Sequence, residues 1–207
     1  MKYDLLMVGV GGQGIITLSE LVGKAAVKKG IHVAGTQDKG LSQRGGSIKA
    51  HVRLGGAYSP MIPKFAADAI LSLEIAETLR CLDFINETTI LLVDTKRIIA
   101  KDDLLKREDE LSPSAVKKIL ANYENVQFVD SESRVRASNV FMLGVLQGFD
   151  PRLTQFITAD EMKEAMKTTF TRRTEENLEA LDQGISFGRE LQKLQSSRCA
   201  ANYANSC

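Results

Sequence analysis

The sequence predicts an α/β protein, a three-layer α/β/α sandwich with a mainly parallel sheet and a helical C-terminal extension. Short apolar runs alternate with amphipathic helix patterns over the first 150 residues, which is typical of a parallel sheet covered by helices. A glycine-rich turn joins the first apolar run to the first helix pattern. After residue 150, capping signals predict helices with no strand between them. These observations predict an α/β domain over 1–150, helices over 151–195 that pack on it or on a partner, and a polar tail over 196–207.

The first unit is predicted to be a strand, a helix and a second strand. Residues 5–10 are continuously apolar, which is typical of a strand buried on both faces. The helix over 14–29 buries an apolar stripe and stops at Gly30. Residues 31–34 form the second strand, so the three elements make a βαβ unit with a right-handed crossover. A glycine-rich phosphate turn occurs in this context.

A long polar loop is predicted from Gly35 to Gly46, because loops of about a dozen residues in a compact domain are usually functional or disordered. Strict alternation then predicts a strand over 47–54. One face of this strand is apolar and buried. The other face carries Ser47, Lys49, His51 and Arg53, and we expect this basic face to be a partner surface.

The remaining elements follow from apolar spacing and capping residues. Strands are predicted over 69–73, 89–93 and 126–129, and helices over 75–84, 112–122, 137–148, from Thr158 onward, and over 174–194. Gly184 and Gly188 lie one helical turn apart and would let another helix approach closely. Glu74 and Asp94 follow strands, where sites in α/β proteins gather, although helix entry and capping explain them equally well.

Composition excludes several classes of function. The 27 basic and 26 acidic side chains nearly cancel, which argues against nucleic acid as a partner. No apolar run approaches the roughly 20 residues that span a bilayer, so a cytoplasmic protein without a membrane partner is expected. The three cysteines, Cys81, Cys199 and Cys207, are too scattered for an iron–sulfur cluster or a zinc site. No metal site is expected on this chain.

The glycine turn is the first candidate site: Gly9-Val10-Gly11-Gly12-Gln13-Gly14. Backbone amides and the positive end of the helix dipole would meet there, which favours a phosphate or another anion. Close packing of strand on helix is the alternative. A dinucleotide-binding fold needs an acidic residue at the end of the second strand, and Asp38 lies two or three residues beyond that position. Ile15 and Ile16 exclude a P-loop, which needs Lys and Ser or Thr after the last glycine.

The second candidate site is the run Ser42-Gln43-Arg44-Gly45-Gly46. A guanidinium among glycines can donate paired hydrogen bonds to a phosphate or carboxylate, whereas the alternative is an ordinary surface arginine. His51 is a weak candidate for a general base. No Ser, Cys or Asp stands at a spacing that indicates a catalytic triad, so a hydrogen-bonding or interface role is the stronger interpretation. No other catalytic residue is predicted.

Taken together, these motifs resemble a known family. The two glycine runs are followed by His51-Val52-Arg53-Leu54-Gly55, Tyr58-Ser59-Pro60 and Ile62-Pro63. The set resembles the gamma-type component of 2-oxoacid:ferredoxin oxidoreductases, and within that family it is most similar to the beta subunit of the indolepyruvate enzymes. Residues 67–74 and 139–144 extend the similarity, which covers nearly the whole chain to about Leu194.

The resemblance implies a subunit of an enzyme that decarboxylates a 2-oxoacid oxidatively on thiamine diphosphate. Electrons would pass through iron–sulfur clusters to ferredoxin, and an acyl-CoA would be released. This chain lacks the Gly-Asp-Gly signature of thiamine diphosphate sites and has too few cysteines for a cluster. Both cofactors are therefore expected on a large alpha subunit, and this chain is expected to be inactive alone, with self-association when isolated.

We expect the two glycine-rich runs to bind phosphate groups, and coenzyme A is the candidate ligand. The expected contacts are Gly9, Gly11, Gly12, Gln13, Gly14, Ser42, Gln43, Arg44, Gly45 and Gly46. Two other classes of function stay open. One is an autonomous nucleotide- or flavin-binding oxidoreductase, and the other is an assembly module without a ligand.

Overall fold

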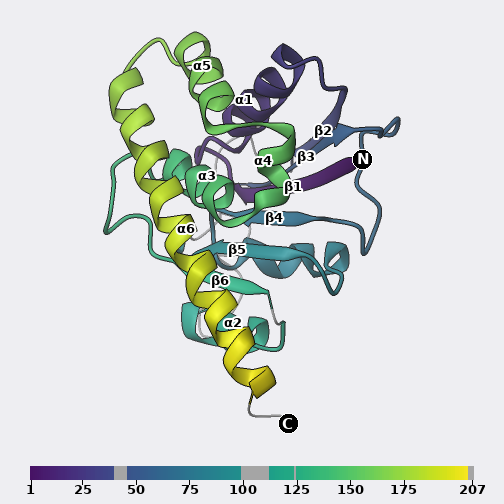
Figure 1. The fold of residues 1–207 in the computed structure, drawn as a ribbon, viewed down its shortest axis with the longest axis vertical. Helices are drawn as coiled ribbons and strands as arrows, with labels where there is room; N and C mark the ends of the chain where they lie inside the picture. The colour runs from purple at the N-terminus through teal and green to yellow at the C-terminus, as the bar shows by residue number, and fades with distance from the viewer. Residues whose placement is uncertain (40–45, 99–111, 124, 205–207) are drawn as a thin grey trace.

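A computed structural model describes residues 1–39, 46–98, 112–123 and 125–204, with the side chains of Lys39 and of residues 198–204 excepted. It contains a six-stranded sheet in the order β2-β3-β1-β4-β5-β6. The strands are β1 (Lys2–Val10), β2 (Val33–Lys39), β3 (Ser47–Gly55), β4 (Ala69–Ser72), β5 (Ile90–Asp94) and β6 (Val126–Val129). Helices cover both faces of the sheet (Figure 1), so the predicted α/β class is confirmed.

The sheet is mixed rather than wholly parallel. Strands β1, β4, β5 and β6 are parallel to one another, whereas β3 runs antiparallel to both of its neighbours, β1 and β2. The first unit therefore differs from the predicted βαβ unit. Strand β2 has the same direction as β1, but β3 is inserted between them, so the glycine turn does not lie between two adjacent parallel strands.

The helices and the 3₁₀ helix η1 divide between the two faces of the sheet. They are α1 (Ile15–Lys28), η1 (Glu77–Phe84), α2 (Pro113–Leu120), α3 (Ser138–Phe149), α4 (Pro151–Phe156), α5 (Ala159–Thr169) and α6 (Thr174–Ala204). Leu5 and Met7 point to the core under α1, α3, α5 and α6, whereas Leu6 and Val8 point to the core under η1 and α2. This alternation along β1 is what a strand buried on both faces requires.

Several predicted bounds were wrong. Residues 75–84 were expected to be an α-helix, but η1 is a 3₁₀ helix that begins at Glu77. Helix α4 was not predicted, and α6 continues ten residues beyond Leu194. The capping signals were right: Ser112 Oγ accepts a hydrogen bond from the Ala115 amide, and Thr158 forms the predicted capping box.

The predicted loop from Gly35 to Gly46 was wrong over its first part, because β2 continues to Lys39. Strand β2 is an edge strand, paired along one side with β3. A strand at an edge tolerates polar side chains, and the polar run Thr36-Gln37-Asp38 therefore looked like a loop in the sequence. The residues from 40 to 45 lie outside the described part of the chain.

The expected basic face of β3 is not a solvent-exposed surface. His51 and Arg53 are buried, and Arg53 is held by Asp4 at 2.7 Å between Nε and Oδ1. The reason is that η1 and the segment after β3 cover this face. For example, the ring of Phe84 in η1 packs against the ring of His51. At His51 and Arg53 the predicted partner surface is therefore covered by the chain itself, whereas Ser47 and Lys49 are partly exposed.

Helices α3 and α6 approach so closely that their glycines touch the opposite backbone. A Cβ at Gly184 would meet Phe141 O, and one at Gly188 would meet Val145 O. Figure 1 shows α6 lying along the molecule across α3. The expectation that these two glycines admit a neighbouring helix is confirmed. Residues of α4, α5 and α6 share one apolar core with the sheet, and the domain boundaries stay a prediction. In the described part of the chain, no helix is both long and apolar enough to cross a membrane.

Candidate functional site

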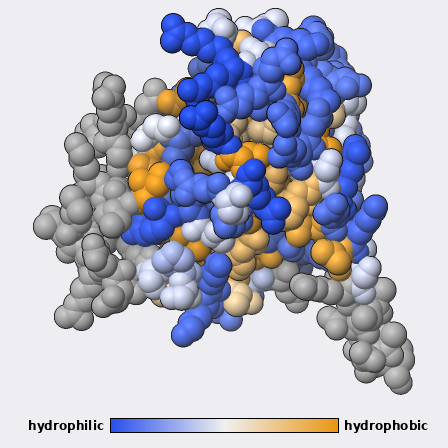
Figure 2. Space-filling view, turned by 90° about the vertical axis from the view of Figure 1, so that its left-hand side faces the viewer, coloured by the Kyte–Doolittle hydropathy of each residue, from blue (hydrophilic) through white to orange (hydrophobic). Residues whose placement is uncertain are grey.

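The carboxyl ends of the parallel strands surround a pocket of about 430 Å³. The glycine turn after β1 lines it, together with Leu73 after β4, Lys96 after β5, and Ser138 and Asn139 at the start of α3. Figure 2 looks onto this side of the molecule, where apolar surface gathers near the middle between hydrophilic borders. The carboxyl edge of an open α/β sheet is where such folds bind ligands.

The glycine turn is fixed by Gln13. Its Oε1 accepts a hydrogen bond from the Val10 amide at 2.7 Å, and its Nε2 donates to the Leu73 carbonyl at 2.5 Å. Gly14 has a φ of 82° and adjoins Asn139, whose Nδ2 donates to the Gln13 carbonyl at 3.1 Å. Gln13 therefore shapes the turn through its side chain, and its contact with a ligand stays a prediction. A glycine is required at position 14 because the backbone φ is positive and because α3 approaches closely there.

The second glycine run meets the first at one described residue. The Gly11 amide donates to the Gly46 carbonyl at 2.9 Å, which places the end of that run beside the turn. Ser42, Gln43, Arg44 and Gly45 lie outside the described residues, so their roles stay predictions. The structure nevertheless brings Gly46 to the same edge of the sheet as Gly9, Gly11, Gly12 and Gly14.

The electrostatics of this edge favour an anion. Helices α1 and α3 both begin here, and neither has a side-chain cap or an acidic residue in its first turn. The first amides of a helix have no backbone partner inside it, and the helix dipole adds partial positive charge. In α3 one of these amides, that of Val140, donates to Asn139 Oδ1 at 2.9 Å. Lys96 lines the same pocket, although it also pairs with Glu132.

Asp94 is the acidic exception in the pocket. Its carboxylate is buried and accepts a hydrogen bond from Ser131 Oγ at 2.5 Å. Burial raises the pKa of Asp94 above its ordinary value, and the hydrogen bonds from Ser131 and the Lys96 amide only partly offset this. Glu74 is also buried, but its carboxylate accepts hydrogen bonds from the Glu77 amide and Arg97. Glu74 therefore organises the backbone beside the pocket.

His51 lies four residues along β3 from Ser47, away from the glycine turn. Its Nδ1 accepts a hydrogen bond from the Ile62 amide at 3.2 Å, and its Nε2 lies 3.7 Å from Asp38 Oδ2. Burial lowers the pKa of His51, which keeps the ring neutral near pH 7. These contacts hold the segment after β3, and the catalytic alternative stays a prediction.

Sequence reasoning missed part of the pocket. Lys96, Ser138 and Asn139 were not singled out, although the order of strands and helices would have placed the end of β5 and the start of α3 at the carboxyl edge. Asn139 carries the clearest signal, since an amide at the beginning of an apolar helix is suited to hold a neighbouring turn. In the described part of the chain, no three His, Cys, Asp or Glu side chains could together hold a metal ion. Cys81 is buried, and burial raises the pKa of its thiol to about 12.

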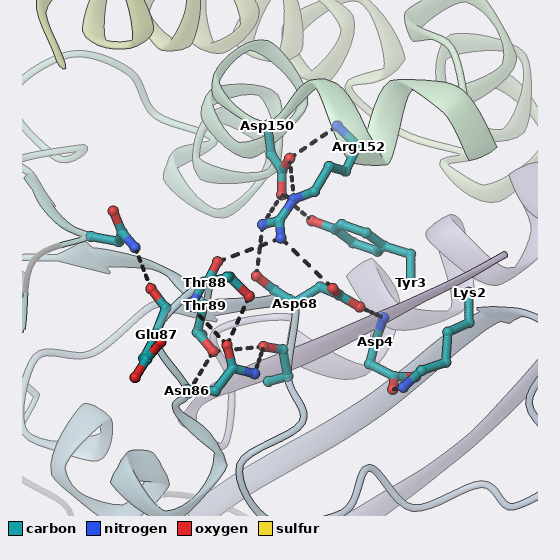
Figure 3. Close-up of polar contacts among 12 residues, drawn as sticks. Lys2, Tyr3, Asp4, Asp68, Asn86, Glu87, Thr88, Thr89, Asp150 and Arg152 are labelled. Atoms are coloured by element: carbon teal, nitrogen blue, oxygen red, sulfur yellow. Dashed lines mark hydrogen bonds and ion pairs between the residues drawn. The ribbon is translucent and has the colours of Figure 1, made fainter. Parts of the chain in front are cut away.

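The opposite, amino edge of the sheet carries a network of charged side chains (Figure 3). Arg152 donates to Asp150 Oδ2 and to the Asp68 carbonyl, both at 2.9 Å, and it also reaches the Thr88 carbonyl. Asp150 accepts a further hydrogen bond from Tyr3 Oη at 2.9 Å. The network ties α4 to the beginnings of β1 and β4, and Asp150 also caps the N-terminus of α4 by accepting a hydrogen bond from the Arg152 amide at 3.0 Å.

Residues 4–187 match the family described as pyruvate ferredoxin/flavodoxin oxidoreductase. The indolepyruvate oxidoreductase subunit IorB of Archaeoglobus fulgidus is 31% identical, and the alignment covers 90% of this chain and 95% of that protein. The crystal structure of pyruvate oxidoreductase subunit PORC from Thermotoga maritima superposes with a TM-score of 0.63 and 20% identity, over 89% of this chain and 96% of that one.

A longer protein also contains this fold. The 2-oxoglutarate:ferredoxin oxidoreductase of Magnetococcus marinus, solved with 2-oxoglutarate, coenzyme A and succinyl-CoA bound, superposes with a TM-score of 0.65 and 18% identity, over 91% of this chain and 31% of that one. The resemblance drawn from the glycine motifs is confirmed. The chain belongs to the pyruvate ferredoxin/flavodoxin oxidoreductase family, as a subunit of a 2-oxoacid:ferredoxin oxidoreductase.

Proposed function

We propose that this chain is the small subunit of an indolepyruvate-type ferredoxin oxidoreductase. Its large alpha partner would hold the thiamine diphosphate and the iron–sulfur clusters, and the clusters would pass electrons to ferredoxin. Support comes from the Archaeoglobus relative, which carries the indolepyruvate name and aligns over 95% of its length. The chain's own cysteines also favour this division, because Cys81 is buried in an apolar core and is the one thiol among the side chains that the structure describes.

The pocket at the carboxyl edge would bind a phosphate group of coenzyme A. The observation that carries this proposal is the meeting of two helix N-termini without side-chain caps, α1 and α3, at a pocket lined by Lys96. Coenzyme A supplies the thiol that accepts the acyl group. The residues of this chain would bind and orient its phosphates, which suits backbone amides directed at an anion.

The subunit assignment is tested by co-expressing this chain with a large subunit that carries thiamine diphosphate and cluster motifs. We expect the purified complex to form an acyl-CoA from indolepyruvate while it reduces ferredoxin, and the small chain alone to do neither. An isolated chain that binds NAD(P) or a flavin tightly and turns over a substrate would overturn the assignment. Two results together would favour the assembly module without a ligand. The isolated chain would bind none of these ligands, and no pocket variant would change the KM of the complex for coenzyme A.

The phosphate contact is tested by Arg44→Ala and Lys96→Ala in the active complex. Loss of one charge-assisted hydrogen bond to phosphate is expected to raise the KM for coenzyme A about tenfold, with little change in the KM for the 2-oxoacid. Arg172→Ala is the matched control, since Arg172 is an exposed arginine outside the pocket. An unchanged KM for coenzyme A in both variants would show that the pocket does not bind the cofactor's phosphates.

A further inference from the structure

The cation of the carboxyl-edge pocket is already paired with an acidic side chain of the chain itself. Among the described residues that line the pocket, Lys96 is the one lysine or arginine, and its ammonium forms an ion pair with the carboxylate of Glu132. We propose that Glu132 competes with the phosphate of the ligand for Lys96, so that the ligand displaces this carboxylate when it binds. The inference rests on the proposed function, because that function supplies the phosphate.

Glu132 lies in a turn after β6 that is fixed to the end of β5. The neighbouring Ser131 donates to the Asp94 carboxylate twice, from its amide at 3.4 Å and from its Oγ at 2.5 Å. The Arg134 amide donates to the Ser131 carbonyl at 3.1 Å, which closes the turn around Glu132. Asp94 precedes Lys96 by two residues, so one anchored pair of side chains holds the backbone on both sides of the ion pair.

The negative charge of Glu132 also reaches the pocket. Asp94 lines the pocket, and its pKa is raised chiefly by burial, with a further contribution from the nearby charge of Glu132. A negative charge that disfavours the ionised form of one acid also disfavours any other anion at the same distance. Glu132 therefore opposes a bound phosphate in two ways, because it occupies Lys96 and because it repels the phosphate directly.

The ion pair between Lys96 and Glu132 is weak enough for a ligand to break. The Glu132 side chain is 56% exposed, and Lys96 is its one partner among the described residues. Ion pairs at the surface contribute little to stability, because water solvates both charges well when they separate. The Glu132 side chain can therefore turn into water while the backbone stays anchored at Asp94. A phosphate in its place would contact Lys96 and would also meet the N-termini of α1 and α3.

The experiment replaces Glu132 with glutamine in the reconstituted complex with the large subunit. Glu132→Gln keeps the size and shape of the side chain and removes its charge. We expect the KM for coenzyme A to fall about threefold, the modest factor that corresponds to an exposed ion pair, with the KM for the 2-oxoacid as the internal reference. Calorimetric titration of the same complex with inorganic pyrophosphate gives a readout independent of activity, and its dissociation constant should fall by a similar factor.

A double-mutant cycle tests whether Glu132 acts through Lys96. Lys96→Ala alone is expected to raise the KM for coenzyme A, as described above. When Lys96→Ala is already present, Glu132→Gln should lower this KM by a smaller factor than it does in the wild type, because no cation remains to compete for. An effect of Glu132→Gln that is equally large with and without Lys96 would overturn the competition for Lys96.

Asp182→Asn is the matched control for the loss of one negative charge. Asp182 pairs with Lys163 at 2.6 Å, and the exposed fractions of these two side chains, 54% and 29%, are close to the 56% and 24% of Glu132 and Lys96. Neither Asp182 nor Lys163 lines the carboxyl-edge pocket. The control should leave the KM for coenzyme A unchanged. An equal fall in both variants would show that the net charge of the protein is responsible, and the competition would be overturned.

The outcomes separate the competition from the proposed function. If neither Lys96→Ala nor Arg44→Ala changes the KM for coenzyme A, the proposed phosphate site is overturned and the competition with it. If Lys96→Ala raises this KM but Glu132→Gln leaves it unchanged, the competition alone is overturned. If Glu132→Gln raises the KM, the competition is also overturned, because Glu132 would then position Lys96 for the ligand.

Discussion

The two edges of the sheet differ in the groups that form them. At the carboxyl edge, glycines, helix N-termini without side-chain caps and Lys96 surround a pocket. At the amino edge, the charged groups of Arg53 and Arg152 are already paired with Asp4, Asp68 and Asp150. A ligand site needs donors that the chain has not used, whereas a rigid scaffold needs its donors satisfied. The difference supports the proposal that the first edge binds an anion, whereas the charged donors of the second edge are used within the chain.

The largest effect on stability is expected at the amino edge, from Arg53→Met. This change leaves Asp4 buried with only Lys2 as a partner and removes the donor that holds the carbonyls of Ser59 and Met61. Breaking a buried ion pair usually costs 3–5 kcal/mol, and the remaining Lys2 places the expected loss at about 3 kcal/mol. Chemical denaturation at pH 7 measures the free energy of unfolding.

The pH dependence of this loss is a second readout. Burial alone would raise the pKa of Asp4, but the hydrogen bonds from Arg53 and Lys2 outweigh it and lower the pKa. A lowered pKa stabilises the fold above the ordinary value of 3.8, and this contribution is lost as the pH falls through the lowered pKa. The gap between wild type and Arg53→Met should therefore shrink in acid. A gap that is equal at pH 7 and pH 3 would show that Arg53 acts through packing and not through its charge.

An intermediate effect is expected from alanine at two glycines of the carboxyl edge. Gly14→Ala places a Cβ about 2.5 Å from Asn139 Nδ2 at a positive φ, and we expect it to lower the free energy of unfolding by about 2 kcal/mol. Gly12→Ala also has a positive φ, but its Cβ meets no atom within 4 Å. We expect a smaller loss of stability, about 1 kcal/mol, and a higher KM for coenzyme A because Gly12 lines the pocket. Equal stabilities and equal KM values for the two variants would show that the turn has no ligand-facing side.

Local patterns were sufficient to predict most of the sheet and its helices. The apolar run before the glycine turn, the capping box at Thr158 and the helix stop at Gly30 depend on neighbouring residues, and the structure agrees with all three. The family resemblance also came from short motifs. Local chemistry alone could not show that β3 is inserted between β1 and β2, because strand order depends on long-range pairing.

The same limit explains the errors around the site. Alternation correctly assigned His51 and Arg53 to one face of β3, but it could not show that the segment after β3 would fold back over them. Polar residues on a strand predict exposure only when nothing packs on them. The pocket likewise combines residues from position 11 to position 139, and no single motif contains Lys96 and Asn139 together.

The smallest expected effect concerns Asp94, whose response to pH should be opposite to that of Asp4. Its pKa is raised by burial, so its contribution to stability is fully present below about 3.8 and is lost as the pH rises through the raised pKa. Asp94→Asn keeps the shape of the side chain and removes this titration. We expect the variant to gain stability relative to wild type as the pH rises from 4 to 7, by about 1 kcal/mol or less. Unfolding measured across this range tests the sign. A variant that loses stability relative to wild type with rising pH would mean that Asp94 is stabilised as a carboxylate. The buried acids Asp94 and Asp4, at the two edges, would then have pKa values shifted in the same direction.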